Sequence, residues 1–187
     1  MPSIKFCSNC GHGVVIRIPE GDQLPRAVCA DCGFVQYENP RVVVGCVPEW
    51  QGQVLLCRRA IEPRRGYWTA PAGFLEIGES LHAAAARETA EEALAEVEIG
   101  SLLSVVNVLH TAQVHVMFRG TLRHARHGAG TESLETGLYP EDQIPWHDLA
   151  FASVRYALER YFEDRRARVE RVHFHDITAR SPAPAPR

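Results

Sequence analysis

Long hydrophobic runs are absent from this sequence: no uninterrupted apolar stretch approaches the roughly 18 residues that a membrane-spanning helix needs. An excess of basic residues is also absent, since 20 Lys and Arg stand against 23 Asp and Glu and give a formal net charge of −3. Broad binding to a phosphate backbone needs such an excess. We therefore expect neither a membrane nor a nucleic acid as partner.

The N-terminal residues, Met-Pro-Ser-Ile-Lys-Phe-Cys, lack the apolar core of a secretory signal, so we expect a cytoplasmic protein. The composition, 45% hydrophobic and 23% charged over 187 residues, is average for a globular chain. It excludes a mainly disordered, collagen-like or coiled-coil protein. A chain of this length buries roughly 70% of the surface of its unfolded state, so it needs no disulfide framework.

Four of the six cysteines form two Cys-x-x-Cys turns with eighteen residues between them. They are Cys7, Cys10, Cys29 and Cys32. A redox pair or disulfides are the alternatives, but two such turns at this spacing favour one tetrahedral zinc ion. Because the protein fills all four positions, the zinc is expected to be structural. Gly11 and Gly33 follow the turns and can adopt the positive φ that a tight turn requires. Cys46 and Cys57 lie in apolar runs and are expected to be buried.

The order of the predicted elements indicates a small zinc module followed by an α/β domain with a mixed sheet. We assign residues 1–38 to a zinc ribbon, 39–176 to the α/β domain and 177–187 to a disordered tail rich in Pro and Ala. Periodicity and turn residues predict strands at 13–18, 26–29, 41–47, 53–58, 67–69, 102–108, 113–122 and 134–139, and helices at 80–96 and 149–168.

The helix predicted at 80–96 contains an unusual group of acids. At about 100° per residue, Glu88, Glu91 and Glu92 share one face, while small or apolar residues on both broad faces predict a helix packed between layers. Like charges at these spacings repel, and a bound cation would remove the cost. Hard oxygen ligands favour Mg²⁺ or Mn²⁺. If helical spacing is the only evidence considered, the alternative is that the three acids form a solvated face without a bound cation.

The segment from Gly73 to Ala95 resembles the Nudix box, G-x5-E-x7-R-E-U-x-E-E-x-G-U, where U is apolar. Six of its seven fixed positions are filled, and they are Gly73, Glu79, Arg87, Glu88, Glu91 and Glu92. Leu94 replaces the last glycine, and Thr89 fits the first U only marginally. The resemblance to Nudix hydrolases covers roughly residues 41–165. It implies a Nudix-type α/β/α sandwich preceded by the zinc ribbon.

The resemblance also implies hydrolysis of a diphosphate that joins a nucleoside to another group, with a divalent metal required. It implies metal ligands at Glu88 and Glu92, at the backbone carbonyl of Ala72, and at Glu91 as a further or outer ligand. Glu79 and Arg87 would form an ion pair that holds the loop of the box against the helix. The expected partner is therefore a nucleotide-diphosphate small molecule, and a homodimer is kept as an option.

A zinc ribbon before a Nudix domain is shared by NADH pyrophosphatases and by ADP-ribose/FAD pyrophosphatases. The Ser-Gln-Pro-Trp-Pro-Phe-Pro-like signature of the first group has no match here. Four segments resemble the second group, namely 132–135, 143–145, 149–153 and 173–175. We therefore favour ADP-ribose or FAD as substrate and keep NADH as the alternative. A binding or regulatory protein on an inactive Nudix scaffold is the alternative of another class.

The general base and the substrate contacts are the remaining candidates. In similar ADP-ribose pyrophosphatases the base is a glutamate on a mobile loop after the box, and the loop at 124–132 has glycines that could allow motion. We choose Glu132 as base, with Glu135 second; Glu91 also stays among the catalytic candidates. The alternative is that Glu132 and Glu135 are both ordinary surface acids without a catalytic role. Further candidates are Arg58 and Arg59 for phosphate and Tyr67 for stacking on adenine or flavin.

Overall fold

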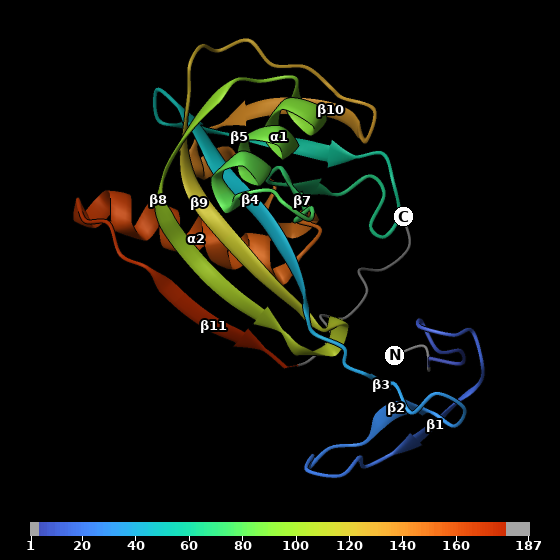
Figure 1. The fold of residues 1–187 in the computed structure, drawn as a ribbon. Coiled ribbons are helices and arrows are strands. Elements are labelled where there is room, and N and C mark those ends of the chain that lie inside the picture. The colour runs from blue at the N-terminus through green and yellow to red at the C-terminus, as the bar shows by residue number, and fades with distance from the viewer. Residues whose placement is uncertain (1–3, 179–187) are drawn as a thin grey trace. The chain divides into compact units, whose positions relative to one another are not determined.

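The computed structural model describes residues 4–178 and divides into two compact units, Met1–Pro40 and Arg41–Arg187. The first unit holds an antiparallel sheet of β1 (Val14–Arg17), β2 (Arg26–Cys29) and β3 (Val35–Gln36), in that order (Figure 1). Both strands predicted in this unit are confirmed to within a residue, and β3 was not predicted. Most of the tail expected at 177–187 lies outside the described residues.

The second unit is built on a mixed sheet in the order β10-β5-β4-β9-β8-β11, with β6 paired to β5 and β7 to β4 (Figure 1). Two pairs, β4/β9 and β8/β11, are parallel and the others are antiparallel. The bounds are β4 (Arg41–Trp50), β5 (Gln53–Arg59), β6 (Trp68–Thr69), β7 (Ala72–Phe74), β8 (Val97–Val108), β9 (Gln113–Leu122), β10 (Ser133–Tyr139) and β11 (His173–Ile177).

All six strands predicted for this unit are present, but two features of the sheet were not foreseen. The strand β8 begins five residues before the predicted start at residue 102, and β7 and β11 were not predicted as strands. Both new strands are short segments whose side chains do not alternate clearly between polar and apolar. Their pairing with β4 and β8 supplies hydrogen bonds that the local sequence does not reveal.

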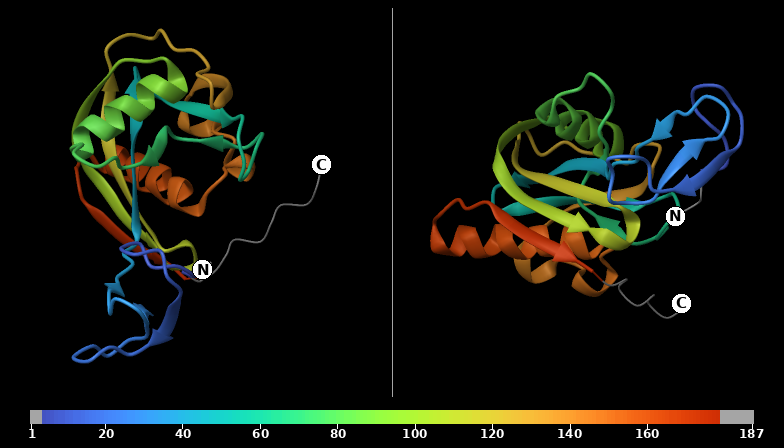
Figure 2. Two further views of the ribbon diagram at one scale, coloured as in Figure 1. Left: turned by 45° about the vertical axis from the view of Figure 1, so that its right-hand side comes forward. Right: turned by 60° about the horizontal axis from the view of Figure 1, so that its bottom comes forward.

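The helices α1 (Leu81–Ala93) and α2 (Ala152–Ala167) cover opposite faces of the sheet (Figure 2). Neighbouring residues of β9 show this division, because Val116 packs in the core beneath α1 and Met117 in the core beneath α2. The predicted α/β/α sandwich is therefore confirmed. Short 3-10 turns lie at Leu109–Thr111, Glu141–Gln143 and Trp146–Asp148. Neither helix of the described residues is long and apolar enough to cross a membrane.

The helix α1 begins as predicted but ends three residues early. The Ser80 side chain caps its N-terminus by accepting a hydrogen bond from the Ala83 backbone N–H at 3.2 Å. At the other end Leu94 takes the left-handed conformation, with φ 47°. It occupies the position of the last glycine of the box, where the chain must turn into β8. The prediction that both broad faces of the helix are buried was wrong, because Ala83 and Ala90 are exposed.

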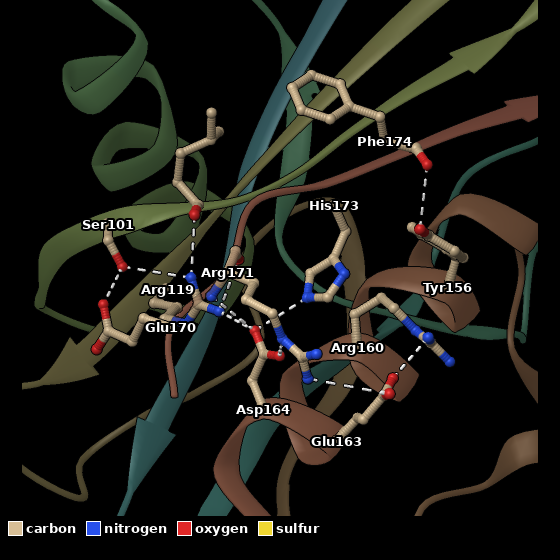
Figure 3. Close-up of polar contacts among 11 residues, drawn as sticks. Ser101, Arg119, Tyr156, Arg160, Glu163, Asp164, Glu170, Arg171, His173 and Phe174 are labelled. Atoms are coloured by element: carbon tan, nitrogen blue, oxygen red, sulfur yellow. Dashed lines mark hydrogen bonds and ion pairs between the residues drawn. The ribbon is translucent and has the colours of Figure 1, made fainter. Parts of the chain in front are cut away.

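The C-terminal strand β11 is held to the domain by a buried carboxylate on α2. The Asp164 side chain is only 2% exposed and accepts hydrogen bonds from Arg119 of β9, from Arg171 and from His173 (Figure 3). The Arg171 Nε and His173 Nε2 atoms each lie 2.9 Å from this carboxylate. Burial raises the pKa of Asp164, but hydrogen bonds from His173 and Arg171 outweigh it, so the pKa lies below its usual value.

Replacing Asp164 with asparagine should destabilise the protein by roughly 3 kcal/mol, because the half-buried Arg119 and His173 would lose the buried anion that they contact. Glu163→Gln is the matched control on the same helix; its side chain is 39% exposed, so we expect a loss below about 1 kcal/mol. Urea unfolding followed by Trp fluorescence measures both. Since folding lowers the pKa of Asp164, its contribution should disappear as the pH falls through that value. Equal losses in the two variants would contradict this account.

Candidate active site

The four thiols of the ribbon lie together with the spacing that a zinc ion requires. All four Sγ atoms are within 4.8 Å of one another, with Cys7 to Cys32 at 3.8 Å and Cys10 to Cys29 at 3.5 Å. Zinc with tetrahedral Zn–S bonds of about 2.3 Å sets neighbouring sulfurs roughly 3.8 Å apart. All four are free cysteines rather than disulfides. The donor set and its geometry therefore fit a structural zinc ion.

The backbone around the thiols supports this arrangement. The N–H groups of Asn9 and Cys32 point at the sulfurs of Cys7 and Cys29, at 3.4 and 3.5 Å. The predicted positive φ of the glycines after the two turns is confirmed, at 77° for Gly11 and 72° for Gly33. The same turn is therefore formed twice around one site.

In the second unit, Arg87 of α1 holds the loop of the box in place. Its Nε and Nη2 atoms contact the two carboxylate oxygens of Glu79 at 2.8 and 3.0 Å, and Nη2 also donates to the Phe74 carbonyl. Such two-point contact fixes direction as well as distance. Hydrogen bonds from Arg87 lower the pKa of Glu79. The structure thus brings together the two residues that the sequence paired.

The acids Glu88 and Glu92 are buried beside β7, with exposed fractions of 8% and 5%. The Glu92 carboxylate accepts a hydrogen bond from the Ala72 backbone N–H at 3.3 Å. Glu88 lies against Gly73, where an added Cβ atom would stand 2.2 Å from the Glu88 Oε1 atom. A glycine is therefore needed at position 73 to leave room for this carboxylate.

Burial raises the pKa of both acids. Burial, together with the charge of Glu88, raises the pKa of Glu92 to about 8. It also raises the pKa of Glu88, although the hydrogen bond from Arg87 opposes this shift. Two neighbouring buried carboxylates with raised pKa values are unfavourable when both are ionised, and a divalent cation would offset their charge. Their oxygen atoms suit Mg²⁺ or Mn²⁺, so the residues fit the expected metal.

The third acid of the box is placed differently. The Glu91 side chain is 60% exposed and accepts a hydrogen bond from Arg87 at 3.0 Å, while Glu88 accepts another from the same nitrogen at 2.8 Å. Within residues 4–178, the groups of three possible ligand atoms within 4.8 Å of one another all belong to the ribbon. The carboxylates of α1 are therefore less tightly gathered than the thiols, and Arg87 binds two of them.

The two candidate bases, Glu132 and Glu135, have different surroundings. The charge of Glu132 contributes to the raised pKa of both Glu88 and Glu92. Glu135 lies opposite Arg58 in the β10/β5 pair and forms an ion pair with it at 3.0 Å. The register shifts between Ser133 and Glu135, where β10 carries a bulge, and Glu132 precedes the strand.

The two candidate arginines also differ. Arg58 contacts Glu135 and the Gly66 carbonyl, whereas Arg59 is only 9% exposed and its charge lowers the pKa of Glu92. The Arg59 guanidinium itself donates to the Pro63 carbonyl at 2.9 Å and lies 5.0 Å from the centroid of the Phe151 ring. Tyr67 is half-buried, with the Arg64 guanidinium 5.8 Å from its ring centroid. The effect of the Arg59 charge on Glu92 depends on the folded sheet and has no signal in the sequence.

Comparison with protein families identifies both units. Residues 5–38 match the zinc-ribbon model described as "Nudix N-terminal", and residues 39–156 match the model of the NUDIX domain. The chain therefore belongs to the Nudix hydrolase family and carries the zinc ribbon of that family at its N-terminus.

Solved structures and curated proteins similar to this chain include the following. A NUDIX hydrolase from Nitrosomonas europaea is 50% identical, with TM-score 0.90 over 93% of this chain and 99% of that one. An ADP-ribose pyrophosphatase from Streptococcus suis shares the fold, with TM-score 0.61 and 18% identity over 73% of this chain and 99% of that one. The NAD-capped RNA hydrolase NudC of Edwardsiella ictaluri is 34% identical over 51% of this chain. The match spans only 35% of that relative's length.

Proposed function

We propose that this chain is a divalent-metal-dependent pyrophosphohydrolase that cleaves the diphosphate of a nucleoside diphosphate derivative. ADP-ribose or FAD is the favoured substrate, and the products are AMP and a phosphorylated second part. The observation that carries the proposal is the buried pair Glu88 and Glu92 beside residues 72–73. Two neighbouring buried carboxylates are costly to ionise, so their retention fits a working metal site better than an inactive scaffold.

In this proposal Glu88, Glu92 and the Ala72 carbonyl hold the metal, and Glu91 is an outer ligand. Bound Mg²⁺ or Mn²⁺ supplies positive charge to the diphosphate and lowers the pKa of the attacking water. Arg87 and Glu79 keep the loop of the box against α1. Glu132 accepts the proton of the water, because the carboxylates that bind metal are poor bases.

The substrate contacts follow from the same geometry. The charge of Arg59 acts on Glu92, and we assign its guanidinium a contact with a phosphate oxygen of the substrate. Arg58 is already paired with Glu135, so we assign it a weaker, outer contact. Tyr67 would stack on the adenine or flavin ring, with its phenol edge left in water.

A second candidate is hydrolysis of a nicotinamide dinucleotide. The curated relatives support it, because they are NAD-capped RNA hydrolases that match this chain at 30–36% identity. Two features oppose it: the Trp-Pro signature of the NADH pyrophosphatases is missing, and the net charge is −3. An RNA substrate therefore remains an outcome of the test below rather than our expectation.

A panel of substrates tests the proposal. The zinc-loaded protein is incubated with FAD, ADP-ribose, NADH, an NAD-capped RNA oligonucleotide or a nucleoside triphosphate, in Mg²⁺ or Mn²⁺, and the products are identified by mass spectrometry. AMP from FAD or ADP-ribose at the highest kcat/KM is the expected result. A preference for NADH or for the capped RNA supports the second candidate. Absence of turnover with every compound supports the inactive scaffold. A sizing column run on the same sample tests for the homodimer.

Glu132→Gln should lower kcat by about 10²–10⁴-fold while the affinity for Mn²⁺ stays close to that of the wild type, because a general base contributes a factor of this size. Glu135→Gln should keep most of the turnover, since the Glu135 side chain faces Arg58. Steady-state kinetics measure kcat, and Mn²⁺ titration measures metal affinity, in both variants. The reverse pattern would identify Glu135 as the base, and normal turnover in both would place the base elsewhere.

A further inference from the structure

The loop at 123–132 is attached to the C-terminal end of α1. The Gly128 N–H donates to the Ala93 carbonyl at 2.8 Å, and the Gly130 N–H donates to the Glu92 carbonyl at 3.1 Å. The last carbonyls of a helix have no partner within the helix, so the loop satisfies two of them. Glu92 therefore touches this loop with its backbone while its side chain belongs to the acid pair.

The two glycines of this loop have different surroundings. A Cβ atom added at Gly130 would lie 1.7 Å from the backbone oxygen of Glu91, a distance at which the backbone must move. A Cβ atom added at Gly128 would meet only the Leu94 side chain at 3.5 Å, which is ordinary contact. Neither glycine has a positive φ. Close approach to α1 is therefore the reason for glycine at position 130.

Two backbone hydrogen bonds hold the chain at Glu132. The Ser133 N–H donates to the Gly130 carbonyl at 3.1 Å, and the Glu132 carbonyl accepts from the Ala60 N–H at 2.8 Å. Two residues span at most about 7 Å, so a shift at Gly130 is passed on to Glu132. The Glu132 side chain makes no hydrogen bond to any described residue. The backbone therefore fixes the Cα position from which the exposed Glu132 side chain extends.

We propose that Gly130 is a positioning residue, whose contact with the end of α1 sets the distance between the Glu132 carboxylate and the acids Glu88 and Glu92. This inference rests on the proposed role of Glu132 as general base. The sequence suggested that glycines in this loop provide motion, whereas Gly130 has a packing role. The helix that bears the metal ligands thereby also aligns the base, since both depend on the backbone at residues 91–92.

The first test compares Gly130→Ala with Gly128→Ala in the full-length, zinc-loaded protein. Gly130→Ala should lower kcat about 100-fold, the loss expected for a misplacement near 1 Å, with KM and Mn²⁺ affinity changed less than about threefold. Gly128→Ala should keep wild-type kinetics. Because Gly130 acts through Glu132, the double variant Gly130→Ala/Glu132→Gln should be no slower than Glu132→Gln alone. Equal kcat in the two alanine variants, or multiplied losses in the double variant, would overturn the proposal.

A second variant covers the outcome in which Gly130→Ala fails to fold. One glycine is inserted between Thr131 and Glu132, both exposed, so the contact of Gly130 with α1 is kept while the turn between the Gly130 carbonyl and the Ser133 N–H lengthens by one residue. Its melting temperature should match the wild type while kcat falls as in Glu132→Gln. A fully active insertion variant rejects the proposal. If Glu132→Gln itself is active, the assignment of the base has failed instead, and the two failures are thus distinguished.

Discussion

Replacing Glu92 with glutamine should lower turnover on the order of a thousandfold while the fold persists. Glutamine keeps the shape of the side chain but removes the charge of a buried metal ligand, and stabilisation of charge by a metal is worth several kcal/mol in the transition state. Glu96→Gln is the control on the exposed side of the same segment, and its turnover should be unchanged. Near-normal activity of Glu92→Gln at saturating Mg²⁺ would count against the metal site.

The same variant should change the stability of the metal-free protein in a pH-dependent way. Burial raises the pKa of Glu92 from 4.5 to about 8, so its contribution to folding is full below pH 4.5 and is lost as the pH rises to 8. A neutral glutamine has no such loss. Without divalent metal, Glu92→Gln should therefore melt above the wild type at pH 8 and show little gain near pH 5. Added Mn²⁺ should raise the melting temperature of the wild type far more than that of the variant.

Replacing Cys10 with serine should release the zinc and unfold the ribbon. Structural zinc contributes about 10 kcal/mol to the folding of small modules, and this unit has few buried apolar side chains of its own, among them Ala27 and Val28. Metal analysis should find one zinc per wild-type chain and none in the variant. Hydrogen exchange should speed up at the N–H groups of Cys7 and Cys29, which are bonded to the carbonyls of His12 and Phe34.

Cys46→Ser is the matched control, because it makes the same substitution at a buried thiol of the second unit, where Thr89 can accept a hydrogen bond from serine. This variant should keep its zinc. Catalysis should survive in part in Cys10→Ser, since the second unit has its own cores on both faces of the sheet. A purified wild-type protein without zinc, or a Cys10→Ser variant that retains it, would refute the assignment.

The sequence alone was sufficient to predict those features whose residues lie close together in the chain. The four cysteines are recognisable because two turns of fixed length must surround one metal, and the structure brings their sulfurs within 4.8 Å of one another. The pairing of Glu79 with Arg87 and the cap at Ser80 are likewise local relations. Most strands also followed from alternation and turn residues, since those signals lie within a few residues of each other.

Spacing along the helix could not decide which acids are buried. Glu88, Glu91 and Glu92 lie within one sector, yet only Glu88 and Glu92 are covered, because β7 packs on one side of that sector and leaves Glu91 in solvent. The end of α1 was misjudged for a related reason. Leu94 favours helix by its own propensity, but the path of the chain into β8 forces it into the left-handed conformation.

The sequence by itself determined the zinc ligands, the acids of the box and the α/β class, because each depends on residues that are near in the chain. Tertiary structure alone decided three other features. It paired β11 with β8 and tied β11 to Asp164 of α2, it paired Glu135 with Arg58, and it brought Gly130 against α1. The physical reason is that hydrogen bonds and charges between distant segments are fixed only when the sheet sets their register.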